Sequence, residues 1–118
     1  MKKVIYFIFL ATLFSCQKNE PIKKVRMYEI LYVFNCPSDF DYSYTRYIRE
    51  NRFGDLLFET VTGDASSNYS IKSFGREGTY IVEATSAADT VVIEVYIDGA
   101  LLHHNKKYQT AKIQFVLK

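Results

Sequence analysis

The side chains that could do chemistry are few, and their spacing assembles no catalytic set. His103 and His104 are adjacent, so on a strand they point to opposite faces and cannot bind one metal ion together. Asp39 and Asp41 form an Asp-x-Asp pair, but the pair lacks the glycine turn and the distal glutamate of a calcium loop. No Gly-x-Ser-x-Gly motif and no glycine-rich phosphate loop occur in the sequence. We therefore expect no enzyme activity, no bound metal and no cofactor.

A second group of residues is aromatic and basic. Tyr42, Tyr44 and Arg46 alternate along the chain, and Tyr47 and Arg49 follow in the other phase. In a strand the first three would share one face, and the last two would share the opposite face. Tyrosine rings stack on sugars, and arginine stacks on tyrosine, so this strand is a candidate surface for a glycan or a protein partner. The alternative is ordinary cross-strand packing, because tyrosine is a favourable strand residue.

The first fifteen residues have the features of an export signal that ends at a cysteine. Two lysines precede an apolar run, residues 4–14, which as a helix would span about 16 Å, roughly half of the hydrocarbon core of a bilayer. This length is typical of a secretory signal and short for a membrane span. The run ends in Leu13-Phe14-Ser15-Cys16, which resembles the lipobox of bacterial lipoproteins, although Phe14 is larger than the residue usual at its position. The resemblance implies that residues 1–15 are a signal peptide and that the Sγ atom of Cys16 carries a diacylglyceryl group.

Lipid on Cys16 would make residues 16–24 a short polar tether between the membrane and the domain. Many inner-membrane lipoproteins have aspartate at the next position, where this chain has Gln17, so the resemblance implies the outer membrane of a Gram-negative bacterium. Which side of that membrane it would face stays open. The alternative is a secreted protein with Cys16 as a structural residue. A lipidated Cys16 would leave Cys36 without a disulfide partner, and we expect Cys36 to be a small buried hydrophobic residue.

Residues 25–118 show the two-residue alternation of β-strands. In residues 90–98, for example, Val91, Ile93, Val95 and Ile97 fall on one face. Turn residues recur at short intervals, and Asp98-Gly99 suits a tight hairpin. We predict a turn at residues 103–108 and separate strands at 79–86, 90–98 and 110–118. The complete pattern predicts an all-β domain, a single antiparallel, immunoglobulin-like β-sandwich of seven or eight strands.

The charge of the chain gives no reason to expect a nucleic-acid partner. The sequence has 118 residues, enough for one domain, with 15 basic and 13 acidic side chains. Lys2 and Lys3 lie in the leader, so beyond Cys16 the basic and acidic residues are equal in number. Nucleic-acid binding proteins usually carry a basic excess on one face.

Four stretches, residues 28–35, 41–55, 80–102 and 111–118, are similar to small envelope β-sandwich proteins of the mycobacterial small-membrane-protein (MmpS-type) accessory kind. The tryptophan frequent in that family is absent here. The resemblance implies a non-catalytic accessory role beside a transporter or another envelope assembly. We therefore expect a lipid-anchored envelope protein with an unidentified protein partner. A glycan-binding module that uses the Tyr/Arg strand is the alternative, and a small hydrolase is a more distant one.

Overall fold

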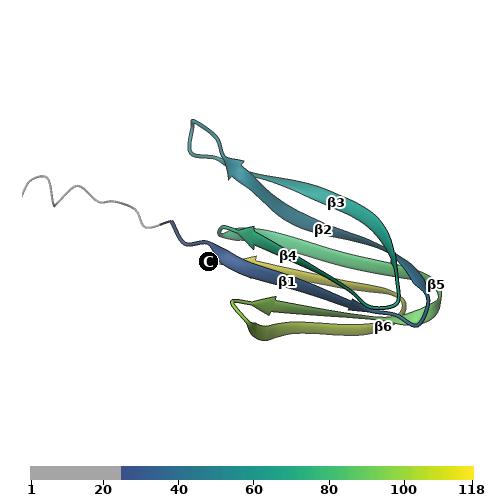
Figure 1. Cartoon of the computed structure of the whole chain (residues 1–118). Coiled ribbons are helices and arrows are strands. Elements are labelled where there is room, and N and C mark those ends of the chain that lie inside the picture. The colour runs from purple at the N-terminus through teal and green to yellow at the C-terminus, as the bar shows by residue number, and fades with distance from the viewer. Residues whose placement is uncertain (1–24) are drawn as a thin grey trace, which may run out of the picture.

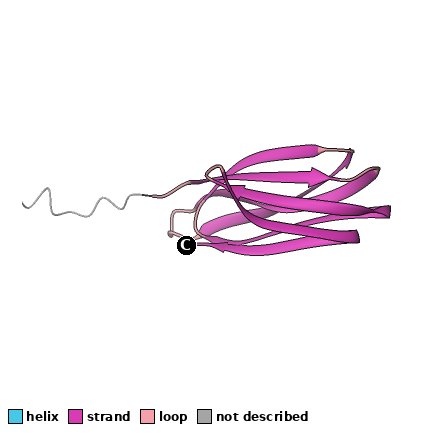
Figure 2. Cartoon of the chain, turned by 90° about the horizontal axis from the view of Figure 1, so that it is seen from below, coloured by secondary structure: helices cyan, strands magenta, loops and turns pink. Residues whose placement is uncertain are grey.

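A computed structural model describes residues 25–118, and this part of the chain is all-β. Strands make up 81% of it, every strand pairing is antiparallel, and the sheet curves until it is nearly a barrel (Figures 1 and 2). The strands are β1 (Tyr28–Asn35), β2 (Asp39–Glu50), β3 (Leu56–Ser66), β4 (Tyr69–Gly75), β5 (Gly78–Ile97) and β6 (Ala100–Leu117). Residues 25–118 contain no helix that could span a membrane. The predicted signal peptide, the lipid site at Cys16 and the tether lie outside the described residues.

A long ribbon of β5 and β6 organises the fold. Residues 78–85 of β5 pair with 110–117 of β6, the register then shifts, and residues 90–97 pair with 100–108. At the shift Gln109 has a φ of 68°, and its side-chain Nε2 donates a hydrogen bond to the backbone oxygen of Ala87 over 2.8 Å. The ribbon bends at this point and has two arms (Figure 1).

The two arms of the ribbon face each other. Asn105 in one arm of β6 donates a hydrogen bond from Nδ2 to the backbone oxygen of Lys112 in the other arm, over 2.8 Å. The ring of His103 stacks on that of Phe115 with 5.2 Å between the centroids. Side chains therefore close this side of the near-barrel, where no backbone ladder joins the two halves of β6.

Each arm carries two further strands. β2 pairs with the first arm of β5 and β3 pairs with β2, while β1 pairs with the second arm and β4 pairs with β1. The order is β3-β2-β5-β1-β4, with β6 on the other side of β5. Strands β1 and β2 are not hydrogen-bonded neighbours, yet they meet face to face, because each belongs to a different arm.

The core lies between the arms and is rich in aromatic rings. Tyr32 and Phe34 of β1 contact Tyr44 and Phe40 of β2, with centroid separations of 5.2 and 5.7 Å. The alternating faces predicted for β5 and β6 are confirmed as buried. Cys36 is free and buried, as predicted. The buried hydrophobic residues are Tyr28, Ile30, Tyr32, Phe34, Cys36, Phe40, Tyr44, Tyr80, Val82, Ala84, Val91, Ile93, Val95, Ile97, Ala111, Ile113, Phe115 and Leu117.

The predicted number of strands was wrong, because six strands are found and not seven or eight. The predicted strands 79–86 and 90–98 are the two arms of one strand, β5. The predicted turn at 103–108 was wrong, because these residues lie inside β6. Inward-facing His103 and Asn105 contact Phe115 and Lys112 in the other arm, so this polar sequence can stay extended. The prediction of an immunoglobulin-like sandwich is not confirmed, whereas the all-β, antiparallel prediction is.

The predicted hairpin turns are present. Asp98 and Gly99 have φ values of 50° and 85°, the positive pair that a type I′ turn requires. The carboxylate of Asp98 also accepts a hydrogen bond from the backbone N–H of Glu29 over 2.9 Å, which ties this turn to β1. Short turns also join β2 to β3 and β4 to β5.

The molecule has two distinct ends. Residue 25, the last residue Lys118 and the turns after β2, β4 and β5 lie at one end, which we call the terminal end (Figure 1). The hydroxyl of Tyr28 donates a hydrogen bond to the backbone oxygen of Lys118 there. The loops after β1 and β3 and the bends of β5 and β6 lie at the opposite end, which we call the bend end.

Two isoleucines of β5 provide a matched test of this core. Ile93 is fully buried and Ile81 is 38% exposed on the same strand. We expect Ile93→Ala to lower the free energy of unfolding by about 2–5 kcal/mol, because it leaves a cavity. Ile81→Ala should cost about 1 kcal/mol or less. Urea unfolding followed by circular dichroism checks this, and equal losses for the two variants would contradict the described inner face.

Candidate functional site

The structure divides the predicted Tyr/Arg surface between the core and the solvent. Tyr42 and Tyr44 share a face, as expected, but it is the inner face. Tyr44 is only 7% exposed, and the half-buried ring of Tyr42 packs between those of Phe34 and Tyr69, at 5.4 and 5.3 Å. These two rings are therefore part of the packing, and they do not form an exposed platform for a sugar.

The remaining residues of the predicted surface lie toward the terminal end of β2. Arg46 is exposed and forms an ion pair with Glu59, its cross-strand neighbour on β3. Tyr47 is half-buried, edge-on to Phe58 at 5.8 Å. Arg49 is exposed and follows a bulge in the pairing with β3. Only Arg46, Tyr47 and Arg49 are thus available to a ligand.

The β2–β3 hairpin leaves the sheet just after Tyr44. The hydroxyl of Thr45 accepts a hydrogen bond from the backbone N–H of Ile81 over 3.1 Å and donates one to its carbonyl oxygen over 3.3 Å. This side chain replaces the backbone ladder at its last position, since pairing of β2 with β5 stops at Tyr44↔Val82. Beyond it the hairpin tip stands off from the other strands (Figure 1).

One arginine bridges the resulting gap. Arg76 forms ion pairs with Glu50 on β2 over 2.6 Å and with Glu77 over 3.2 Å, and its side chain is 13% exposed. Burial lowers the pKa of Arg76, but Glu50 and Glu77 outweigh this and raise it, so the guanidinium stays charged. The ion pair with Glu50 stabilises the tip in its stand-off position.

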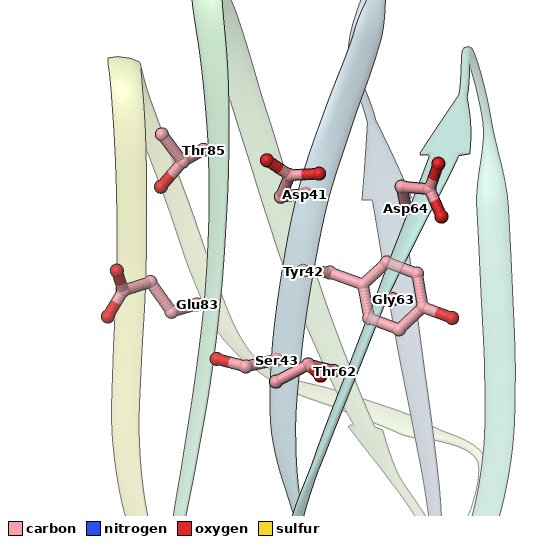
Figure 3. A pocket seen from close by; sticks show the side chains of 8 residues that line it. All are labelled: Asp41, Tyr42, Ser43, Thr62, Gly63, Asp64, Glu83 and Thr85. Carbon is pink, nitrogen blue, oxygen red and sulfur yellow. The ribbon is translucent and has the colours of Figure 1, made fainter.

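A polar depression of about 420 Å³ lies on the outer face of β3, β2 and β5 (Figure 3). Asp41 of β2 and Asp64 of β3 are direct cross-strand neighbours in it, a like-charge arrangement that is unfavourable in isolation. Gly63 is required beneath them, because a Cβ atom there would collide with the ring of Tyr42, which Figure 3 shows lying across it. The residues that line the depression are Asp41, Tyr42, Ser43, Thr62, Gly63, Asp64, Glu83 and Thr85.

The depression presents carboxylates and hydroxyls, which would accept hydrogen bonds from amino, guanidinium or hydroxyl groups of a partner. Sequence reasoning missed it, because it considered only the Asp39/Asp41 pair. Asp39 and Asp41 lie in β2, and Asp64 lies in β3. The alternation of polar residues along 41–43 and 62–64 was visible in the sequence, but the register that aligns them was not.

The two histidines point to opposite faces of β6. His103 is half-buried against Phe115, and His104 is exposed. Residues 25–118 contain no group of three His, Cys, Asp or Glu side chains placed to hold a metal ion. No protein-family model matches this chain, and no curated protein matches it either.

The buried tyrosines give the domain a defined response to alkali. Burial raises the pKa of Tyr80 to about 12, and it raises that of Tyr32 further. The hydrogen bond that the Tyr42 hydroxyl donates to Tyr69 is the main cause that raises the pKa of Tyr42 to about 12. The folded state therefore keeps phenolic protons that an unfolded chain loses near pH 10.

We expect the free energy of unfolding to fall as pH rises from about 10 toward 12, because deprotonation then favours the unfolded chain. The buried phenols of Tyr32 and Tyr80 each contribute up to about 1.4 kcal/mol per pH unit in this window, and their contribution is intact below pH 10. Tyr80→Phe should reduce the slope. Urea unfolding at a series of pH values measures it, with Tyr108→Phe, at a 65% exposed position, as the control. An unchanged slope in Tyr80→Phe would contradict the buried phenol.

Proposed function

We propose that this protein is a lipid-anchored protein of the cell envelope whose β domain binds a protein partner and performs no catalysis. The lipobox-like Leu13-Phe14-Ser15-Cys16 and the polar residues 17–24 support the anchor. The likeness of residues 25–118 to small accessory proteins of the envelope supports a role beside a transporter or another assembly. The outer membrane of a Gram-negative bacterium is the proposed location.

The observation that carries the proposal is the position of the polar depression relative to residue 25. Residue 25 leads to the tether and lies at the terminal end, whereas the depression around Asp41, Asp64 and Thr85 lies toward the bend end. A membrane-tethered domain would therefore present this face away from its attachment, where a partner can reach it.

We also propose that the domain is a small β-sandwich. The two arms of the β5–β6 ribbon, one with β2 and β3 and the other with β1 and β4, would act as the two layers of a small β-sandwich. Such a framework fixes outward-facing side chains on rigid strands, which suits recognition of a partner without a deep cleft.

The glycan-binding alternative has less support. It needs exposed tyrosine faces, and Tyr44 is in the core. The residues still available to bind a glycan are Tyr47 and the two exposed arginines, Arg46 and Arg49. A sugar would then meet one half-buried ring edge and not a stacking platform.

The two cysteines provide a matched test of the anchor. In a Gram-negative host we expect mass spectrometry to find a mature chain that starts at Cys16 and carries a diacylglyceryl group. Cys16→Ser should abolish cleavage and membrane attachment, while Cys36→Ser, at a buried thiol, should leave both intact. A bare Cys16 sulfur in the wild-type chain, or an attached leader, would refute the proposal.

Two threonines test the partner surface. Thr62 lines the depression, and Thr79 is exposed near the start of β5, at the terminal end and outside the depression. With a photo-crosslinking amino acid at either position in the full chain, irradiation of intact membranes should yield a discrete protein adduct from position 62 and little from position 79. Asp41→Asn with Asp64→Asn should reduce that adduct several-fold. Equal adducts from both positions would argue against this face, and sugar binding that Tyr47→Ala abolishes would favour the glycan alternative.

A further inference from the structure

Exposed apolar side chains are concentrated at the terminal end of the domain. Among the exposed large hydrophobic residues within residues 25–118, only Tyr69 and Tyr108 lie at the bend end, and both carry a hydroxyl. Ile81 lies midway along its arm. The remaining ones surround the point where residue 25 joins the domain: Val25, Met27, Ile48, Phe53, Phe74, Leu101, Leu102 and Val116.

The most prominent of them is Phe53, at the tip of the β2–β3 hairpin. Its side chain is 76% exposed, and the guanidinium of Arg52 lies 5.0 Å from the centre of its ring. Asn51 fixes the turn, since its Oδ1 accepts hydrogen bonds from the backbone N–H groups of Phe53 and Asp55, each over 2.9 Å. The turn therefore holds an apolar ring and a cation outward together, without contacts to the core.

Basic side chains accompany Phe53 at the hairpin tip. Within residues 25–118, Arg49 and Arg52 form no ion pair. Glu50 is paired with Arg76, and the other carboxylate of the tip, that of Asp55, accepts a hydrogen bond from the Nδ2 atom of Asn51 over 3.3 Å. Among the charges of the tip that form no ion pair, two are therefore cationic and one is anionic.

Exposed apolar side chains next to unpaired arginines suit the interface of an anionic bilayer. Aromatic residues partition into the headgroup region, and basic residues next to them are attracted by anionic lipids. Eight residues lie between Cys16 and Val25, so the nine steps from one to the other span at most about 30 Å when extended. A chain anchored at Cys16 would keep the terminal end within that distance of the membrane surface.

We propose that the terminal end docks on an anionic lipid surface, with Phe53 and the arginines of the β2–β3 tip inserted among the headgroups. This inference rests on the proposed lipid anchor. It adds an orientation, in which the tip contacts lipid and the polar depression faces away. Docking would convert a loosely tethered domain into one held at a defined height.

The chain contains no tryptophan, so one introduced tryptophan is an unambiguous reporter. The full chain with Phe53→Trp is reconstituted into vesicles of phosphatidylethanolamine and phosphatidylglycerol, with or without shallow brominated acyl chains. We expect its emission to shift to the blue and to be mostly quenched by the brominated lipid. Tyr108→Trp, at another exposed aromatic position, 65% exposed and at the bend end, should show neither change. Adding Arg49→Gln and Arg52→Gln to Phe53→Trp should reduce the quenching.

Flotation and the mass of Cys16 report the anchor separately from the docking. If the chain is lipidated and floats but the two tryptophans behave alike, docking is wrong and the anchor stands. If Cys16 carries no lipid, the proposed anchor fails, and the same variants are added to preformed vesicles at high lipid concentration. Selective quenching of Phe53→Trp then supports docking on its own, and its absence overturns it.

Discussion

The register break in the β5–β6 ladder, between Thr85 and Thr90, is the constraint on which the rest of the structure depends. An isolated two-stranded ribbon is marginal in water, because it has no second layer to bury its apolar face. The break lets the ribbon fold over, and local side chains satisfy the backbone there. The hydroxyl of buried Ser86 accepts a hydrogen bond from the N–H of Asp89 over 3.3 Å and lies 3.2 Å from the hydroxyl of Ser38. The side chain of buried Ser86 thus replaces part of the backbone hydrogen bonding that the ladder loses at the bend.

The space between the arms explains why the chain uses so many tyrosines. Buried tyrosines fill the core with their rings, and Tyr28, Tyr32 and Tyr80 place their hydroxyls at its edge, where a backbone carbonyl accepts a hydrogen bond from each. Tyr80 donates to the carbonyl of Arg76 over 2.7 Å, and Tyr32 donates to that of Thr45 over 3.3 Å. The second bond fastens the base of the β2–β3 hairpin at the residue where its backbone pairing with β5 has just ended. The aromatic content is therefore largely structural, and the hydroxyls link the core to its periphery.

Alternation in the sequence was enough to predict an all-β domain, the buried faces of β5 and β6, the Asp98-Gly99 turn and the buried Cys36. It was not enough to say which face of β2 is inner, since Tyr42 and Arg46 have the same phase and only tertiary packing distinguishes a core tyrosine from a surface one. It also could not reveal that the polar residues 103–108 stay extended, because their partners lie across the bend. The cross-strand alignment of Asp41 with Asp64 depends on register, which no local pattern encodes.

An antiparallel fold with this connectivity separates its two ends in space. Three of the five connections, the turns after β2, β4 and β5, lie at the end where residue 25 joins β1. The loops after β1 and β3 and the two bends lie at the other end. Residues of the β2–β3 tip can thus be selected for one environment, and the outer residues around Asp41 for another. The long, continuous strands between them hold the two sets at a fixed separation, so a change at one end need not disturb the other.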